Sequence, residues 1–289
     1  MNRRRFHLHL ATTLIAAPAL ARAAKPHASP APWAAIEAAS GGRLGVAVLH
    51  ADGRLAGHRL DERFPMCSTF KWLAAAHVLQ RVDTGRESLE RRVHFDRSVL
   101  LPHSPLTSPH AGSSEGMSVA QLCEAAVTQS DNAAANLLLQ SFGGPQGLTA
   151  FARRLGDRAT RLDRWEPALN EARAGDPRDT TTPRAMVGLL RTALVGAALS
   201  PTGRAQLAQW LEACATDGQR LRAGLPAGWR MGSKTGSGAH GTSNDVGIVW
   251  PPAGEPVLVA VYITGSQASE ARRAQAIARV AAEVTAGTR

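Results

Sequence analysis

The strand-forming segments of this 289-residue chain lie near its two ends, and helix-forming sequence separates them. Residues 43–50 alternate apolar positions, residues 52–53 predict a turn, and residues 55–60 return as the second strand of a hairpin. Towards the C-terminus, the apolar runs 245–250 and 257–264 predict adjacent antiparallel strands. If all four strands join one sheet, the helical block is an insertion into a single α/β domain.

The helical block carries its own start and stop signals. Capping residues that precede a first helical turn occur at Ser118 with Gln121, at Thr182-Pro183 and at Ser200-Pro201. Helices are expected over residues 31–39, 70–82 and 119–128. Gly143-Gly144 is expected to terminate the helix that follows Asn132.

A closing helix completes the predicted architecture. Its apolar positions share one face and can pack on the sheet: Ile277, Val280, Ala281 and Val284. The expected fold class is α/β with an inserted all-α domain, in which an antiparallel sheet is flanked by helices. Residues 24–66 together with 213–289 are expected to form the α/β domain, and residues 67–212 the all-α domain. The cleft between them is the predicted site.

The first 23 residues are typical of an export signal. Arg3-Arg4-Arg5-Phe6 precedes an apolar stretch, and the small-residue site Ala21-Arg22-Ala23 follows it. The paired arginines favour a twin-arginine signal, and a general secretory signal is the alternative. The apolar run is far short of the ~20 residues that span a bilayer. We therefore expect a periplasmic protein, cleaved near Ala23, without a stable membrane anchor.

The composition bears on the binding partners. The formal net charge of +10 falls to +6 when the four arginines of residues 1–23 are removed. No Lys/Arg run is interleaved with aromatic residues, which make up 4% of the chain, so no nucleic-acid partner is expected. The positive charge favours anionic small-molecule substrates. We expect a monomer.

The three cysteines, Cys67, Cys123 and Cys214, permit at most one internal disulfide. For Cys67, which precedes a candidate nucleophile, the favoured interpretation is a small buried side chain. No Cys/His spacing indicates a metal site.

Three polar motifs and one glutamate carry the candidate chemistry: Ser68-Thr69-Phe70-Lys71, Ser130-Asp131-Asn132, Glu166 and Lys234-Thr235-Gly236. A Ser-x-x-Lys match alone occurs about once by chance in a chain of this length. The tripeptides are rarer, and their order around the glutamate makes coincidence a poor explanation. Taken singly, the first motif favours a capping serine with a solvated lysine. The competing interpretation of the last motif is a strand end at a tight turn, which the other elements disfavour.

Ser68 and Lys71 are spaced for nucleophilic catalysis. If a helix begins at the serine, residues three apart share one face, so the hydroxyl and the amine can meet. Unpaired N–H groups at the helix start favour developing negative charge, and the N–H of Ser68 can form half of an oxyanion hole. A lysine acts as a base only when neutral, and both the helix start and a cation such as Lys234 would lower its pKa.

Across the mature chain, these motifs resemble class A serine β-lactamases. The resemblance implies hydrolysis of the β-lactam ring of penicillins and cephalosporins through a serine acyl-enzyme, and hence antibiotic resistance. Ser68 would be the nucleophile and Ser130 would pass a proton to the departing nitrogen, with Lys71 or Glu166 as the acylation base. Substrate would be bound by Asn132, Lys234, Thr235, Gly236 and the backbone N–H of Ser237, whereas Asp131 would be structural. No cofactor is implied.

The segment from Arg164 to Asn170 resembles the Ω-loop of this family, about residues 161–179 here. Glu166 and Asn170 would hold the water that hydrolyses the acyl-enzyme, with Glu166 as its general base. The resemblance also implies an ion pair between Arg164 and Asp179, and a cis bond between Glu166 and Pro167.

Two further residues bear on the choice of substrate. His103 stands where relatives usually carry a tyrosine that stacks on the substrate, and a histidine can still stack. Arg220 matches an arginine that supports the substrate carboxylate in relatives lacking one near Ser243, and an ordinary surface charge is its competing interpretation.

In some carbapenem-hydrolysing relatives the cysteine before the nucleophile has a disulfide partner, but Cys67 lacks it, because the corresponding region reads Ser237-Gly238.

Two alternatives stay open. A penicillin-binding D-alanyl-D-alanine peptidase resembles this family in fold, nucleophile and Lys-Thr-Gly strand, and Glu166 in its Ω-loop context argues against it. A non-hydrolytic β-lactam-binding sensor domain would be acylated once and stay loaded. Turnover beyond one equivalent distinguishes a β-lactamase from the sensor.

Overall fold

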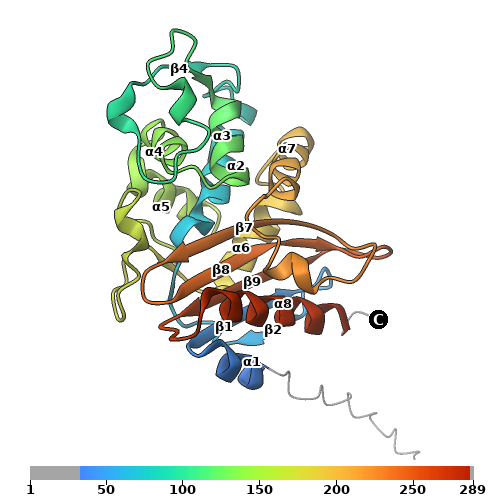
Figure 1. Cartoon of the computed structure of the whole chain (residues 1–289). Helices are drawn as coiled ribbons and strands as arrows, with labels where there is room; N and C mark the ends of the chain where they lie inside the picture. The colour runs from blue at the N-terminus through green and yellow to red at the C-terminus, as the bar shows by residue number, and fades with distance from the viewer. Residues whose placement is uncertain (1–32, 287–289) are drawn as a thin grey trace, which may run out of the picture. The chain divides into compact units, whose positions relative to one another are not determined.

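The computed structural model describes residues 33–286. Its centre is a five-stranded antiparallel sheet with the strand order β2-β1-β9-β8-β7 (Figure 1). The strands are β1 (Arg43–Leu49), β2 (Leu55–His58), β7 (Arg230–Gly238), β8 (Thr242–Trp250) and β9 (Val257–Thr264). Because β1 pairs with β9 along its whole length, strands from the two ends of the chain are neighbours in one sheet.

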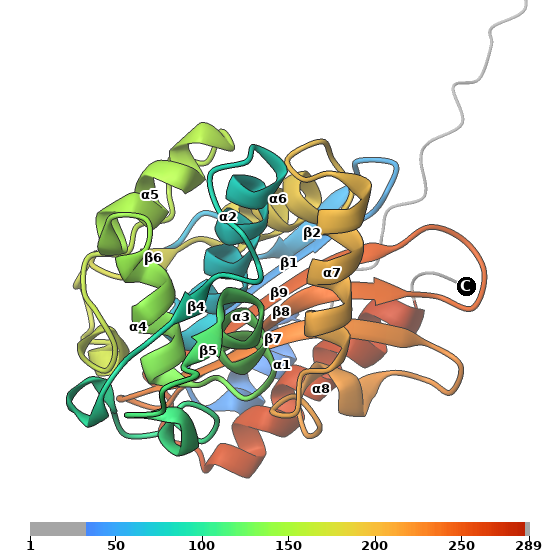
Figure 2. The same cartoon turned by 90° about the horizontal axis from the view of Figure 1, so that it is seen from above.

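Helices cover both faces of this sheet (Figures 1 and 2). The helices are α1 (Trp33–Ser40), α2 (Phe70–Asp83), α3 (Val119–Thr128), α4 (Asn132–Gln140), α5 (Gly144–Arg154), α6 (Pro183–Leu194), α7 (Pro201–Glu212) and α8 (Glu270–Ala286). Figure 1 shows α1 and α8 on one face of the sheet and α2 to α5 beyond the other. The helix α6 packs directly on β9 and β1, and α7 on β7.

Strand β9 reads as one apolar run because both of its faces are buried. Val257, Val259, Val261 and Ile263 join the core beneath α1 and α8. The alternate residues Leu258, Ala260 and Tyr262 join the core on the helical side. The period-2 geometry of a strand thus divides one sequence run between two hydrophobic cores.

Most of the predicted elements are confirmed. The hairpin of β1 and β2 forms, and β9 has the predicted bounds. The capping box of Ser118 with Gln121 opens α3, and the side chains of Thr182 and Ser200 cap α6 and α7. The apolar face predicted for α8 is buried against the sheet.

The prediction for Gly143-Gly144 is wrong. Helix α4 already ends at Gln140, and α5 begins at Gly144. Gly143 and Gly144 have φ angles of 91° and 72°, a left-handed backbone that turns the chain into α5. The glycine pair therefore marks the start of a helix and not the end of one.

Two short ladders and three 3₁₀ turns position the site. The ladder of β3 (Phe64–Pro65) with β6 (Thr180–Thr181) joins the approach to α2 to the end of the Ω-loop, and β4 (Arg92–Val93) pairs with β5 (Met117–Ser118). The turns are η1 (Cys67–Thr69), η4 (Ala168–Glu171) and η5 (Leu221–Gly224). Turn η1 packs against β7, which brings the first and last motifs together.

The predicted export signal over residues 1–23 lies outside the described residues. Within residues 33–286, no helix has the length and the apolar character needed to cross a bilayer. The division at residues 67 and 212 stays a prediction.

Candidate active site

Ser68 lies at the centre of η1, in the turn that leads into α2. The preceding residue Cys67 has a φ of 47°, an unfavourable backbone that the surrounding contacts hold in place. One of these contacts is the hydrogen bond from Met66 N to Asp179 O, which ties the turn to the end of the Ω-loop at 2.9 Å. The regular helix begins at Phe70, so the nucleophile precedes the helix and does not belong to it.

Lys71 is buried and is surrounded by three acceptors from two segments, the Ser130-Asp131-Asn132 motif and the Ω-loop. Its Nζ donates to Ser130 O at 2.7 Å and to Asn132 Oδ1 at 2.6 Å, and it lies 3.0 Å from Glu166 Oε1. Burial lowers the pKa of Lys71, whereas the nearby Glu166 carboxylate opposes that shift. Burial is therefore the main cause of the lowered pKa of Lys71, whereas the helix start and the neighbouring cation were the causes expected from the sequence.

Glu166 connects the Ω-loop to the nucleophile. Its Oε1 accepts a hydrogen bond from Ser68 Oγ at 3.3 Å, and its Oε2 accepts one from Asn170 Nδ2 at 2.5 Å. Its backbone is held by the side chain of Asn136, which donates to Glu166 O at 3.0 Å and accepts from Glu166 N at 3.1 Å. The carboxylate thus has a fixed position beside the serine hydroxyl.

Ser130 lies between two buried ammonium groups. Lys234 Nζ donates to Ser130 Oγ at 3.1 Å, and Lys71 Nζ approaches the same oxygen at 3.4 Å. Ser130 has a φ of 58°, a strained conformation of the kind that concentrates at functional sites. Burial lowers the pKa of Lys234 to about 8, and the charges of Lys71 and Arg220 act in the same direction.

Arg220 is buried, so the interpretation as a surface charge is wrong. Its guanidinium donates to the backbone oxygens of Gly236 at 3.0 Å and Asn244 at 2.7 Å, and to Ser237 Oγ at 2.7 Å. The Lys-Thr-Gly motif forms part of β7, where Thr235 Oγ1 is hydrogen-bonded to Thr216 Oγ1. A fixed positive charge therefore lies against the end of the motif strand.

His103 and Asn132 form the opposite side of the site. Asn132 N donates to His103 O at 3.0 Å, and Asn132 Nδ2 donates to Pro102 O at 2.8 Å. The imidazole Nε2 of His103 lies 2.8 Å from Gln129 O on the exposed surface. The side chain is thus held against the protein, and its free ring face is the part that can stack on a ligand.

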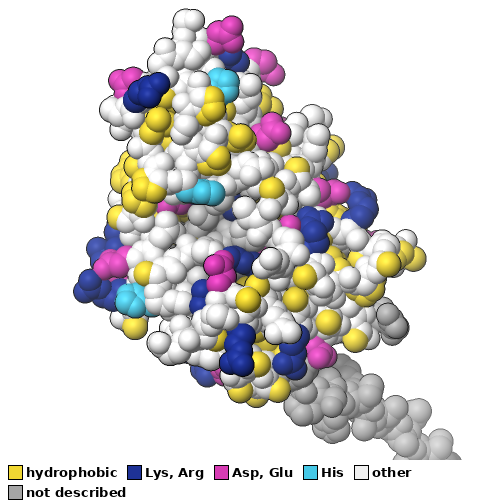
Figure 3. Space-filling model, in the orientation of Figure 1, with side chains coloured by type: hydrophobic (Ala, Val, Ile, Leu, Met, Phe, Trp, Pro, Cys, Tyr) yellow, Lys and Arg dark blue, Asp and Glu magenta, His cyan; other side chains and the backbone are white. Residues whose placement is uncertain are grey.

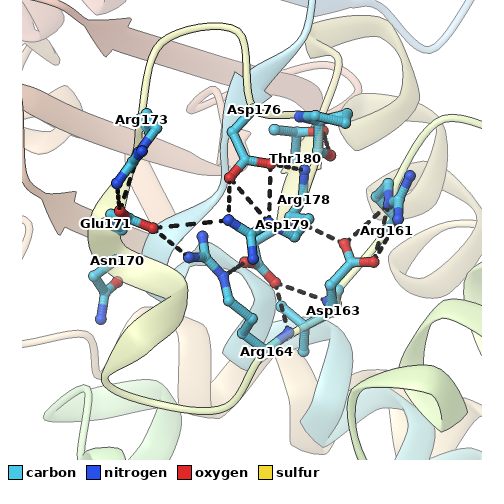
Figure 4. Close-up of polar contacts among 12 residues, drawn as sticks. Arg161, Asp163, Arg164, Asn170, Glu171, Arg173, Asp176, Arg178, Asp179 and Thr180 are labelled. Atoms are coloured by element: carbon cyan, nitrogen blue, oxygen red, sulfur yellow. Dashed lines mark hydrogen bonds and ion pairs between the residues drawn. The ribbon is translucent and has the colours of Figure 1, made fainter.

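The Ω-loop is held by a network of ion pairs (Figure 4). Arg164 lies between Asp179, at 2.6 Å, and Glu171, at 2.5 Å. The predicted Arg164–Asp179 pair and the cis bond before Pro167 are both confirmed. Figure 4 shows Asn170 pointing away from the ion pairs, so this side chain is free to contact Glu166.

Asp131 has the structural role that was expected for it. Its carboxylate accepts from Thr107 Oγ1 and from the backbone N–H groups of Leu106, Thr107 and Ala134. The side chain therefore caps α4 and fixes the loop that carries His103.

Asn136 and Thr216 belong to the site although no motif contains them. Asn136 lies one helical turn after Asn132, a spacing that places both on one face of α4 and could have revealed it. Thr216 lies in the loop after α7 and offers no comparable signal.

The three cysteines are all buried and free. Burial raises the pKa of Cys67 well above its usual value, so its thiol stays protonated beside the nucleophile. Within residues 33–286, no cluster of His, Cys, Asp and Glu side chains is arranged to hold a metal ion.

Comparison with known proteins agrees with this geometry. Residues 33–287 match a family model described as the beta-lactamase enzyme family. The chain is 46% identical over 255 residues to Beta-lactamase CTX-M-8 from Citrobacter amalonaticus, covering 88% of this chain and 87% of that protein. It is also 46% identical over 254 residues to Beta-lactamase Toho-1 from Escherichia coli, with coverage of 88% and 87%.

A solved structure shows the same architecture. The class A β-lactamase described as the last common ancestor of Gram-negative bacteria, GNCA4, is similar with a TM-score of 0.87 and 58% sequence identity. The match covers 89% of this chain and 98% of that one.

Proposed function

Because this chain belongs to the beta-lactamase enzyme family, with the fold and activity of its class A members, we propose how individual residues perform that activity. The reaction is hydrolysis of the β-lactam ring, which gives resistance to β-lactam antibiotics. One observation carries the assignment: Ser68 Oγ and Lys71 Nζ both contact the same carboxylate oxygen of Glu166.

In the acylation step, Ser68 Oγ forms a bond to the lactam carbonyl carbon and the ring C–N bond breaks. Glu166 Oε1 is 3.3 Å from the serine hydroxyl, within range to accept its proton directly or through a water. Lys71 stabilises the buried carboxylate and can return a proton through Ser130, whose hydroxyl lies 3.4 Å from Nζ. Ser130 delivers that proton to the departing nitrogen.

Substrate binding relies on positive charge at the end of β7. Lys234 and Thr235 would hold the substrate carboxylate, and Arg220 supports that site through Gly236 O and Ser237 Oγ. The N–H groups of Ser68 and Ser237 would stabilise the oxyanion. Asn132 would bind the side-chain amide of the antibiotic, and His103 would stack on the substrate.

In the deacylation step, Glu166 and Asn170 hold a water whose oxygen attacks the ester carbonyl. Glu166 takes one water proton, the ester C–O bond breaks, and Ser68 Oγ regains a proton. The contact of Asn170 Nδ2 with Glu166 Oε2 supports this role, because it places both hydrogen-bonding groups side by side.

The test is hydrolysis of a chromogenic cephalosporin by the mature protein with EDTA present. Wild type and the exposed-loop control Glu255→Ala should turn over many equivalents. Ser68→Ala should form no adduct, and Glu166→Ala should accumulate a one-to-one adduct seen by intact mass. Fast turnover by Ser68→Ala, or hydrolysis of the Glu166→Ala adduct at the wild-type rate, would refute the assignment. A wild-type adduct without turnover would favour the peptidase or the sensor.

We further propose export to the periplasm through the signal over residues 1–23, with cleavage near Ala23 and a monomeric mature enzyme. Replacing Arg4 and Arg5 by lysine should block export through the twin-arginine route and leave uncleaved protein in the cytoplasm. Undiminished export of this variant would favour the general secretory route. Light scattering of the mature protein reports its oligomeric state.

A further inference from the structure

A cavity of about 1090 Å³ lies between residues 172–177, at the tip of the Ω-loop, and the strands beside them. We call it the sub-loop cavity. Its other walls are residues 42–43, 62, 63, 65 and 180, the turn at residues 240–241, and residues 264–267 at the end of β9. None of the catalytic residues proposed above lines it. Its volume reaches the size of small-molecule sites.

We propose that the sub-loop cavity binds a small carboxylate with an apolar body, and that its occupancy changes the rate of deacylation. The walls are mainly apolar, which favours the apolar part of such a ligand. Figure 3 shows basic, acidic and histidine side chains gathered on the flank where the Ω-loop lies in Figure 1. The charged side chains of these walls determine which polar group of a ligand the cavity can bind.

Most charged side chains of the cavity wall are already paired. Arg43 contacts Glu62 at 3.0 Å, and Asp176 contacts Arg178 at 2.6 Å. Arg173 is likewise paired with Glu171, at 2.6 Å.

Arg63 is the exception, because it has no acidic partner among the described residues. It donates from Nη1 to Ala159 O at 2.8 Å and to Thr180 Oγ1 at 3.0 Å. Both bonds use one nitrogen, so the N–H groups of Nε and Nη2 remain for a carboxylate. The side chain of His240 also belongs to the wall of the cavity.

The loop tip is poorly attached to the strands that face it across the cavity. The Ω-loop is tied to the body on either side of the tip, by Ala239 N to Asn170 O and by Met66 N to Asp179 O, each at 2.9 Å. Within the described part of the chain, no hydrogen bond joins residues 172–177 to the five-stranded sheet, although Thr180 Oγ1 of the short strand β6 donates to Pro177 O at 2.6 Å. A ligand in the cavity would therefore bridge two surfaces that the protein itself leaves unconnected.

Coupling to catalysis follows from the position of the tip. Asn170, which contacts Glu166, lies two residues before Ala172, where the segment that covers the cavity begins. A ligand that binds more tightly to one position of residues 172–177 than to another shifts the loop towards the first position, and Glu166 shifts with it. The size of this population shift is set by the difference between the two binding free energies. This regulatory part rests on the proposed role of Glu166, whereas ligand binding does not.

The binding test uses 4-phenylbutyrate as the probe and 4-phenyl-1-butanol as its uncharged counterpart, titrated calorimetrically into the mature protein. We expect saturable binding of the carboxylate and at least about tenfold weaker binding of the alcohol. Arg63→Gln removes the charge, and Ala174→Trp fills the cavity from the loop tip, so each should weaken binding by a similar factor. Arg97→Gln and Ala253→Trp, exposed changes outside the cavity, should bind as wild type does.

The same probe could enter the active site, because that site is also proposed to hold a carboxylate. Titration is therefore repeated on the Glu166→Ala acyl-enzyme, in which the active site is occupied. Unchanged affinity would support the sub-loop cavity, whereas loss of binding on acylation would overturn it. No saturable binding to wild type, or wild-type affinity in both Arg63→Gln and Ala174→Trp, would also overturn it.

The regulatory part is measured as the decay of a preformed wild-type acyl-enzyme, with and without saturating 4-phenylbutyrate. A rate that changes in wild type and not in Ala174→Trp supports the coupling. Binding without any change in that rate refutes the regulatory part. Failure to form an acyl-enzyme would instead refute the proposed function, while calorimetry on unmodified protein still reports binding.

Discussion

The ammonium group of Lys71 lies 3.0 Å from the carboxylate of Glu166, and neither side chain is exposed to solvent. Lys71 belongs to the helix that follows the nucleophile, and Glu166 belongs to the Ω-loop. The pair therefore joins the segment that forms the acyl-enzyme to the segment that hydrolyses it. The two opposite charges lie together in a buried site, so each offsets part of the cost of burying the other.

Breaking the ion pair at the base of the Ω-loop should destabilise the protein. Asp179 is buried, and Arg164→Gln would leave its carboxylate without its charged partner. We expect a loss of about 3–5 kcal/mol in the free energy of unfolding, together with slower deacylation. Urea denaturation and acyl-enzyme decay measure the two effects. The matched control Arg173→Gln breaks an exposed pair and should cost less than about 1 kcal/mol; equal losses in both variants would contradict the prediction.

Asn136 should be needed for deacylation because its side chain holds the backbone of Glu166. Asn136→Ala removes both hydrogen bonds to the backbone of Glu166 and should slow acyl-enzyme decay more than acylation. The lost bonds should also cost about 1–3 kcal/mol of stability. Stopped-flow measurement separates the two chemical steps, and Gln140→Ala, an exposed change on the same helix, serves as the control. Equal slowing of both steps would argue against a specific effect on Glu166.

Substrate capture should weaken at alkaline pH. The pKa of Lys234 is lowered to about 8, so its ammonium group is charged below that pH and loses its proton above it. For an anionic β-lactam, kcat/KM should decrease above pH 8, and the decrease should approach about tenfold for each further pH unit. Lys234→Arg keeps its charge throughout this range and should show no such decline. The same alkaline decline in both proteins would assign it to another group.

Acid should destabilise the helical layer through His77. This buried imidazole is stacked on Phe151 at 4.3 Å and accepts a hydrogen bond from Arg154 at Nε2. Burial, followed by the charge of Arg154, lowers its pKa to about 4, below the value of 6.5 expected when unfolded. The folded state therefore favours the neutral form of His77. The free energy of unfolding should decrease as the pH falls below 6.5, because the unfolded state then binds a proton more readily.

Urea denaturation at pH 8 and pH 5 measures this effect. Between pH 8 and pH 5, the free energy of unfolding should decrease by about 2 kcal/mol more in wild type than in His77→Phe, whose side chain has no titratable group. His94→Gln changes an exposed histidine and should follow wild type. If His77→Phe loses as much stability as wild type, another group causes the acid sensitivity.

Local signals in the sequence predicted several elements closely. The cap at Ser118 and the apolar run of β9 depend on residues next to one another in the chain, so their bounds can be read directly. No apolar alternation predicts β7, because glycine and polar residues fill its motif end, which is nevertheless largely buried in the structure. Its pairing with β8 and the contact of η1 make that end a strand.

The motif residues identify the chemistry from sequence alone, because acyl transfer requires a nucleophile, proton-transferring groups and fixed positive charge in any fold. Tertiary structure decided how they meet. It placed the carboxylate of Glu166 against both Ser68 and Lys71, and it buried Arg220 beneath Gly236 and Ser237. Local sequence does not reveal these contacts, because they join residues far apart in the chain. It does not reveal the pKa values of the two lysines either, because burial in the folded protein lowers them.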